Sequence, residues 1–193
     1  SKITPITGLV ALFTVLFLGG NLLKRFGWLF SALITPIVIG TTGTIFFIFS
    51  YNKDLLGPIA LSLGTTPLFM VVILGAFQNI ASKVVKYSFF DSTKEMAYIP
   101  LDQESKVKGK AAIDMVGSRL GKSSSSWIQV ALIDILGSGS VILITPYLVP
   151  LVLAATAYWA YSIKYISKEL ANKEARLQVA TQEKTTKTPT PAI

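Results

Sequence analysis

Five long apolar stretches run along the chain, separated by shorter polar connections. They occupy residues 6–23, 28–51, 55–81, 111–136 and 141–163. A transmembrane helix needs roughly 17–25 mostly apolar residues, so each stretch is long enough to cross a bilayer once. The pattern therefore predicts an all-α polytopic membrane protein.

The polar segments divide this bundle from the rest of the chain. A charged connection over about 83–110 separates the third stretch from the fourth. The residues from Lys164 onward are polar and end in TTKTPTPAI, a composition typical of a mobile tail. We expect a helix bundle over 1–166 and a tail over 167–193.

Lysine and arginine gather in alternate connections. They are dense in the connections at 24–25 and 83–110 and in the tail, and sparse near Lys53 and in the LGSGS turn at 136–140. Basic residues mark the cytoplasmic side of a membrane protein, so five spans predict a cytoplasmic C-terminus. The chain begins SKITPITG, without methionine, and enters an apolar stretch almost at once. We expect it to be a piece of a longer protein, with an odd number of spans upstream if that protein begins in the cytoplasm.

The composition supports the membrane interpretation and disfavours an enzyme. Hydrophobic residues make up 51% and charged residues 15% of the 193 positions, against about 25% charged in soluble domains. There is no cysteine and no histidine, which excludes disulfides, Cys/His zinc sites and a histidine base. We expect no cofactor, no metal site and no catalytic residues. The net charge of +8 follows the membrane sidedness, so no nucleic-acid partner is expected.

The fourth stretch is the least apolar and the most informative. A charge in mid-membrane costs about 2.5–3.5 kcal/mol on insertion scales, so charged residues there usually face a bundle interior or a watery cavity. At roughly 100° per residue, four polar positions fall within about 80° of one another on a helix. They are Arg119, Lys122, Ser126 and Gln129.

Two interpretations of this stripe stay open. In the first, Arg119 and Lys122 reach the headgroups by snorkelling, and the four serines at 123–126 only allow close helix packing. Alternatively, the two cations face a cavity and bind phosphate oxygens, while Ser126 and Gln129 hydrogen-bond a sugar or base. Asp114 and Asp134 flank the stripe on opposite sides and are candidate gate or charge-pair residues; alternatively, Asp134 would only cap or pair near the outer surface.

A weaker polar stripe lies on the third stretch. Gly75, Asn79, Ser82 and Lys86 share one face there. Asn79 is expected first as an inter-helix hydrogen-bonding residue and second as a substrate ligand. Lys86 and the adjacent Lys83 are most simply anchors on the positive side.

The triplet Gly121-Lys122-Ser123 looks like the end of a phosphate-binding loop, but its spacing is wrong. That loop requires G-x-x-x-x-G-K-[ST] after a β-strand. Only three residues separate Gly117 from Gly121, and the preceding KVKGKAAIDMV lacks the alternation of a strand. An ATPase is therefore disfavoured, and measurable hydrolysis by the purified protein would revive it.

One segment resembles a known family. Residues 89–123 contain KEMAYIPLD at 94–102 and KGKAAID at 108–114. These resemble the ATP/ADP translocase family of intracellular bacteria and plastids, chlamydial members above all, and the resemblance covers 1 to about 166. The turn GGNLLKRFGW at 19–28 is similar to a short turn of major facilitator transporters.

The resemblance implies a fold and a function. Family members have about twelve helices in a major-facilitator-like bundle, so this chain would supply helices eight to twelve and lack the N-terminal helices. It implies exchange of external ATP for internal ADP across the bacterial inner membrane, with phosphate a further candidate cargo. Where the family has LGKSGGALIQ the chain has LGKSSSSWIQ. Lys122 and Gln129 match, whereas 124–127 depart, which puts in doubt any role that needs glycine flexibility there.

Alternatives to exchange remain. A proton-driven importer of the same family needs a titratable carboxylate, for which Asp114 or Asp134 is available. A non-transporting membrane subunit would use its basic face for partners or acidic lipid. Within the KEMAYIPLD segment, Lys94 and Glu95 are expected either to form a gate strut or to lie in a solvated loop.

Overall fold

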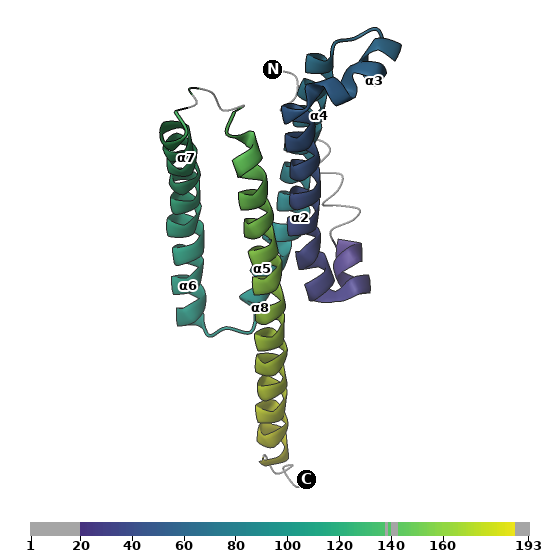
Figure 1. Cartoon of the computed structure of the whole chain (residues 1–193). Coiled ribbons are helices and arrows are strands. Elements are labelled where there is room, and N and C mark those ends of the chain that lie inside the picture. The colour runs from purple at the N-terminus through teal and green to yellow at the C-terminus, as the bar shows by residue number, and fades with distance from the viewer. Residues whose placement is uncertain (1–19, 138, 140–142, 188–193) are drawn as a thin grey trace.

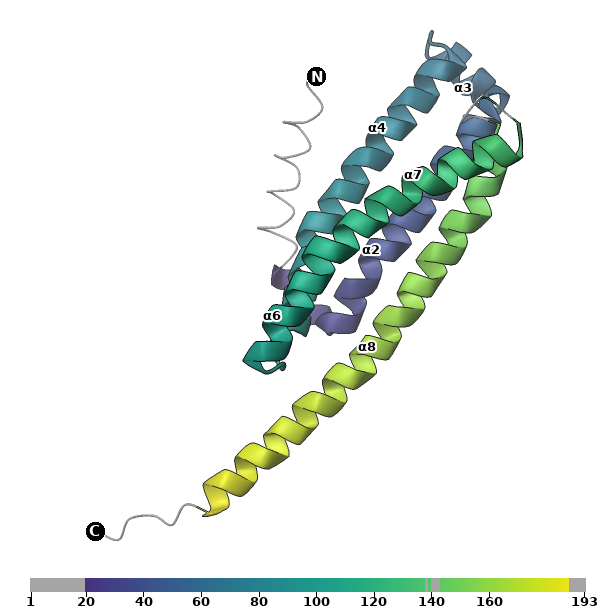
Figure 2. The ribbon, with the colours of Figure 1, turned by 90° about the vertical axis from the view of Figure 1, so that its left-hand side faces the viewer.

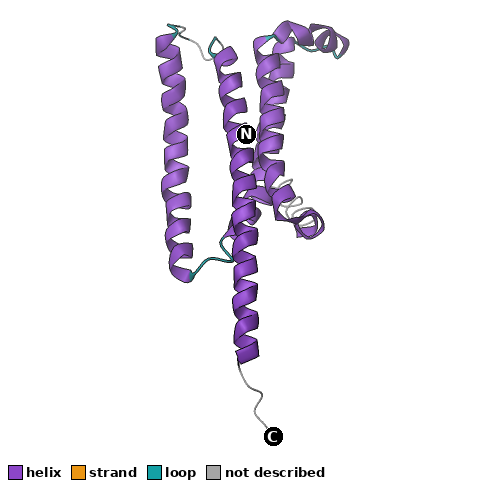
Figure 3. Cartoon of the chain, turned by 60° about the horizontal axis from the view of Figure 1, so that its bottom comes forward, coloured by secondary structure: helices purple, strands orange, loops and turns teal. Residues whose placement is uncertain are grey.

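The chain is helical throughout the part that the structure describes. A computed structural model describes residues 20–137, 139 and 143–187, and no strand occurs among them (Figures 1 and 3). This confirms the all-α prediction. The helices are α2 (Gly20–Tyr51), α3 (Gly57–Ser62), α4 (Pro67–Val85), α5 (Asp91–Ala97), α6 (Gln103–Ala111), α7 (Ser118–Ile135) and α8 (Thr145–Lys187).

Short turns of other helix types link several of these elements. A 3-10 turn, η2 (Lys53–Leu56), follows α2. The π-helical turns η3 (Lys86–Phe90) and η4 (Ala112–Gly117) join α4 to α5 and α6 to α7 without a break. Two long rods result, one from α4 to α5 and one from α6 to α7.

Local chemistry sets the helix ends. Gly27 has φ 79° and ψ 175°, a conformation that favours glycine, and it breaks α2 into a short first piece and a long rod. The Thr66 hydroxyl accepts a hydrogen bond from the Phe69 N–H, and Pro67 occupies the first turn of α4. Asp102 caps α6 by accepting from the Ser105 N–H at 2.9 Å, which lowers the pKa of the Asp102 carboxyl.

Three helical stretches among the described residues are long and apolar enough to cross a membrane. They are Gly27–Tyr51, Pro67–Ala97 and Thr145–Val179. The first coincides with the predicted span at 28–51. The helix expected from residue 55 begins at Pro67 instead, because the short α3 and a left-handed Gly64 at φ 65° precede it.

The other three predicted spans compare with the structure in different ways. The stretch at 6–23 lies outside the described residues. The stretch at 111–136 is helical, but because of its polar residues it is not among the three helices that are apolar enough to cross a membrane. The helix expected over 141–163 begins at Thr145.

The C-terminal segment is longer and more regular than its composition suggested. The tail expected to be mobile from Lys164 is helical as far as Lys187. Alanine, glutamate, lysine and glutamine favour helix, which accounts for the continuation. At 43 residues, α8 is about 65 Å long, roughly twice the thickness of the hydrocarbon core. It projects well beyond the other helices (Figures 1 and 2).

Helix α2 is the centre of the packing, lying against both α8 and α4. Small residues allow the close approach. A Cβ at Gly40 would lie 3.2 Å from the Thr156 hydroxyl oxygen of α8, and one at Gly75 would lie 3.0 Å from Phe46 of α2. Small residues at such crossings are characteristic of helix association in membranes.

Polar contacts fix the same helices in register. The Thr42 hydroxyl of α2 donates to the Gln78 amide oxygen of α4. The Trp28 indole N–H donates to the Thr93 carbonyl of α5 at 2.9 Å. The ring of Phe90 meets Trp159 of α8 edge-on, with 5.5 Å between centroids. Helix α2, the continuous rod of α4, η3 and α5, and the middle of α8 therefore form one packed group.

We expect Gly75→Ala to destabilise this group. The added methyl would press on the Phe46 ring, and overpacking of this kind costs about 1–3 kcal/mol. The matched control is Gly109→Ala, whose Cβ would lie 3.7 Å from the Tyr98 ring, an ordinary contact. The control should be neutral or gain up to about 1 kcal/mol from helix propensity. Thermal unfolding in detergent, followed by tryptophan fluorescence, measures both. Equal stability of the two variants would contradict the close α2–α4 packing.

Candidate functional site

The predicted stripe lies on α7. Arg119, Lys122, Ser126 and Gln129 all fall within this regular helix, and all four are exposed. Ten residues of helix separate the first from the last, which is about 15 Å. The stripe is therefore comparable in length to a nucleotide with its phosphates.

Neither cation of the stripe is neutralised by its own chain. Among the described residues, Arg119 and Lys122 form no salt bridge. Both charges are consequently available to an anion that comes from outside this part of the chain. Guanidinium and ammonium groups are well suited to phosphate oxygens.

The serines beside Lys122 satisfy their hydroxyl protons locally. Ser125 and Ser126 donate to the Lys122 carbonyl at 2.9 and 3.3 Å. Such back-bonding lets serine occupy an apolar helix without an external partner. The Ser126 oxygen keeps its capacity to accept a hydrogen bond, so in this rotamer it suits a donor such as a hydroxyl or an amine.

The α7 helix is two-faced, and neither face is covered by the described residues. Every residue from Ala111 to Ala131 is exposed. Leu120, Trp127 and Ile128 lie on the side opposite the stripe and are exposed as well. The rod formed by α6 and α7 stands apart from α2 and α4 (Figure 1). An apolar face and a cationic face on one uncovered helix call for two different surroundings.

Two ion pairs tie the base of this rod to α5. Lys94 Nζ lies 2.6 Å from Asp114 Oδ1, and Lys110 Nζ lies 2.7 Å from Glu95 Oε2. We call these four residues the clasp. The Lys94 side chain is only 19% exposed, which makes this pair the better protected of the two.

A buried tyrosine packs inside the clasp. Tyr98 is 5% exposed, and its ring lies against the backbone at Gly109. Burial raises the pKa of the Tyr98 hydroxyl, and Asp114 contributes in the same direction. The hydroxyl has no hydrogen-bond partner among the described residues. The ring therefore acts as an apolar spacer between the end of α5 and helix α6.

The sequence identified three members of the clasp and missed the fourth. The sequence predicts Lys94, Glu95 and Asp114 as gate or charge-pair residues, whereas Lys110 is one of several lysines in the basic connection at 83–110. No local pattern singles out Lys110, because its pairing with Glu95 depends on how α6 meets α5. Lys110 and Asp114 lie one helix turn apart, and they pair with the adjacent Glu95 and Lys94 in reversed order along the chain.

Two further candidates lie away from the stripe and the clasp. Asp134 is exposed near the opposite end of α7; the 20 residues that separate it from Asp114 correspond to about 30 Å of helix. These two carboxylates therefore belong to different ends of the molecule. Asn79 is exposed on α4, and the inter-helix hydrogen bond expected of it is made by the neighbouring Gln78.

A second basic region lies where α2, α4 and α8 meet. Lys83 and Lys86 line a cavity of about 310 Å³ together with Thr35, Phe90 and Trp159. Lys86 also lies 3.5 Å from Asp91 and 4.3 Å from the centre of the Tyr87 ring. These lysines were expected as simple surface anchors. Their place in the cavity depends on a three-helix junction that no local sequence pattern indicates.

Comparison with known proteins gives a consistent answer. Residues 1–170 match the family described as TLC ATP/ADP transporter. The chain is 49% identical over 179 residues to ADP,ATP carrier protein 1 of Chlamydia muridarum, covering 91% of this chain and 34% of that protein. It is 50% identical over 162 residues to the Chlamydia trachomatis protein of the same name, covering 84% and 30%.

A rickettsial protein is also similar. ADP,ATP carrier protein 4 of Rickettsia bellii is 43% identical over 160 residues, covering 81% of this chain and 31% of that protein. The chain thus spans about a third of the length of the curated relatives that it matches. No solved structure matches it. The expected family resemblance is confirmed.

The clasp predicts a charge-swap result. Lys94→Asp should lower the melting temperature, because it places a carboxylate against Asp114, and Asp114→Lys should do the same with two cations. The double exchange should recover most of the loss, since it restores opposite charges at the same positions. Lys108→Glu is the control: it disrupts only the exposed pair with Glu104 and should have little effect. Additive losses in the double variant would contradict a direct Lys94–Asp114 interaction.

Proposed function

Because the chain belongs to the TLC ATP/ADP transporter family, we propose that the complete protein exchanges external ATP for internal ADP. Relatives named ADP,ATP carriers support this proposal. The three apolar helices make the protein a multi-pass membrane protein. Phosphate is a further candidate cargo, because it offers the same oxygens to the same cations. Exchange needs no hydrolysis, so the protein is not expected to act as an enzyme.

One structural observation supports the proposal most directly. Arg119 and Lys122 form an exposed stripe with no counter-charge among the described residues. Two unpaired cations on a membrane helix are tolerated where they face a watery cavity. A nucleotide brings several negative charges to that cavity, and its interaction with the cations is stronger there than in bulk water.

The remaining helices of the complete protein would form the other wall of that cavity. Transporters of this kind hold the substrate near the middle of the membrane and move two bundles around it in alternating access. In our proposal, some of those helices pack against the apolar face of α7. Its cationic face lines the cavity, which holds water and substrate. A major-facilitator-like arrangement of the whole bundle is part of this proposal.

The ends of the described helices support a consistent orientation. The α5–α6 connection and the extension of α8 lie at one end of the molecule, and α3 and the C-terminal end of α7 lie at the other (Figures 1 and 2). The first end carries most of the lysines. We propose that it faces the cytoplasm of a bacterial inner membrane.

The clasp gives α7 a mechanical link to the rest of the bundle. Because Lys94 and Glu95 grip Asp114 and Lys110, a movement of α5 is transmitted to the base of α7. In our proposal the clasp acts as a cytoplasmic strut that keeps the cationic stripe in register while the two bundles move. Asn79 of α4 is retained as a candidate ligand on the same cavity.

Lys122→Gln should lower ATP uptake into proteoliposomes that contain the complete protein and are preloaded with ADP. Loss of one charged hydrogen bond predicts a fall of roughly 10- to 100-fold in apparent affinity. Lys122→Arg should retain more activity than Lys122→Gln because it keeps the charge. The control is Lys164→Gln, which removes one exposed charge from α8. Undiminished flux in Lys122→Gln would contradict the cavity and favour a non-transporting subunit.

Counterflow separates exchange from proton-driven import in the same vesicles. Preloaded ADP should strongly stimulate ATP uptake, and an uncoupler should leave that uptake largely intact. Uptake that ignores internal ADP and stops with the uncoupler would contradict exchange. Asp114→Asn and Asp134→Asn would then identify the titrating carboxylate.

A further inference from the structure

The extension of α8 carries an aromatic band followed by a basic one. Tyr158, Tyr161 and Tyr165 are 73%, 68% and 61% exposed, and their spacing of three and four places them on one side of the helix. Tyrosines gather where the hydrocarbon core meets the headgroups. Helix α8 therefore leaves the membrane close to these residues.

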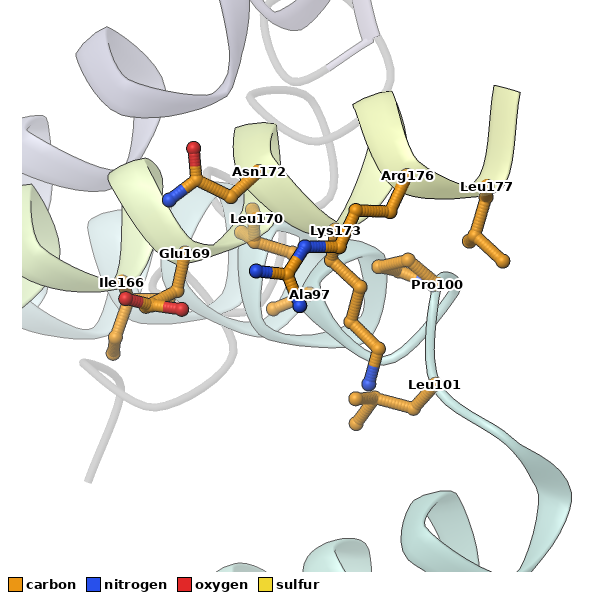
Figure 4. Close-up of a pocket in the computed structure, with 10 residues that line it drawn as sticks. All are labelled: Ala97, Pro100, Leu101, Ile166, Glu169, Leu170, Asn172, Lys173, Arg176 and Leu177. Atoms are coloured by element: carbon orange, nitrogen blue, oxygen red, sulfur yellow. The ribbon is translucent and has the colours of Figure 1, made fainter. Parts of the chain in front are cut away.

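A groove opens immediately after this band. It has a volume of about 760 Å³ and lies between α8 and the segment that ends α5 (Figure 4). Its apolar wall consists of side chains from both elements: Ala97, Pro100, Leu101, Ile166, Leu170 and Leu177. A groove of this kind at headgroup level can take an apolar chain that enters from the membrane.

The polar rim of the groove carries two cations. Lys173 and Arg176 line it together with Glu169 and Asn172 (Figure 4). Neither cation forms a salt bridge with another residue of the described chain, although Lys173 is near enough to Asp102 to help lower the pKa of that carboxyl. The rim is therefore net positive, and two of its charges are available.

We propose that this groove binds one anionic glycerophospholipid of the cytoplasmic leaflet. The phosphate would lie between Lys173 and Arg176, and an acyl chain would run along Ile166 and Leu170 toward the membrane. Glu169 and Asn172 would accept hydrogen bonds from headgroup hydroxyls such as those of glycerol. Basic pockets beside membrane helices on the cytoplasmic side are suited to acidic headgroups.

The charge pattern favours a lipid over the other occupants of an apolar groove. A helix of the same protein or a second copy would need an acidic, apolar segment that reaches this level of α8. An anionic lipid is both acidic and apolar, and the aromatic band places the membrane surface at this level of α8. The proposal concerns a site outside the transport cavity, and it does not depend on which substrate the protein carries.

Native mass spectrometry of the complete protein in detergent tests this site. With equal amounts of phosphatidylglycerol and phosphatidylcholine, the wild type should retain phosphatidylglycerol preferentially. Removing both cations with Lys173→Gln and Arg176→Gln should weaken that binding roughly 30-fold. The matched control, Lys164→Gln with Lys168→Gln, removes two charges from the opposite side of the same helix and should keep most of the binding.

A second variant tests the groove itself rather than the charge. Ala97→Phe fills the groove and leaves every cation in place, so phosphatidylglycerol binding should fall although the net charge is unchanged. Unaltered binding in Ala97→Phe would show diffuse attraction and overturn the proposal. The proposal is also overturned if the control variant Lys164→Gln/Lys168→Gln weakens binding as much as Lys173→Gln/Arg176→Gln does. A wild type with no preference for phosphatidylglycerol would also overturn it, because the groove would then be empty or filled by protein.

Discussion

A lysine or arginine inside a bilayer needs water or a counter-charge, and this requirement determines how α7 can be used. Arg119 and Lys122 lie on a helix that must cross the membrane if the predicted five-span topology holds, yet the described chain offers them no acidic partner. Burying both in lipid would cost several kcal/mol. In our proposal, a cavity shared with the rest of the protein removes that cost, and the two cations bind a polyanionic substrate there.

In our proposal, the rest of the described structure holds that helix in place. Glycines at 40 and 75 let α2 approach α8 and α4, and these three helices form the fixed part. The clasp then connects this part to the rod that carries the stripe. Because its two ion pairs join successive residues of α5 to residues one helix turn apart, in reversed order, they fix register as well as distance. In our proposal, the uncovered faces of α7 contact the remaining helices of the complete protein.

Local patterns in the sequence predicted much of this arrangement. Apolar length located the helix at 28–51, and helical spacing placed Arg119, Lys122, Ser126 and Gln129 on one side. Other features depend on contacts between distant segments and had no such signal. Gln78 rather than Asn79 meets α2 because of the rotation of α4, and Lys110 joins the clasp only because the fold brings α6 within reach of Glu95. The start of the third long helix was misplaced because apolar composition continues through the α3 turn, where Gly64 and Pro67 set the true boundary.

The position of bound nucleotide in the complete protein tests the central claim most directly. An experimental structure with ADP should place a phosphate oxygen about 2.7–2.9 Å from Lys122 Nζ, with Arg119 facing the same water-filled space. Nucleotide held elsewhere, with both side chains directed toward lipid or headgroups, would contradict the account.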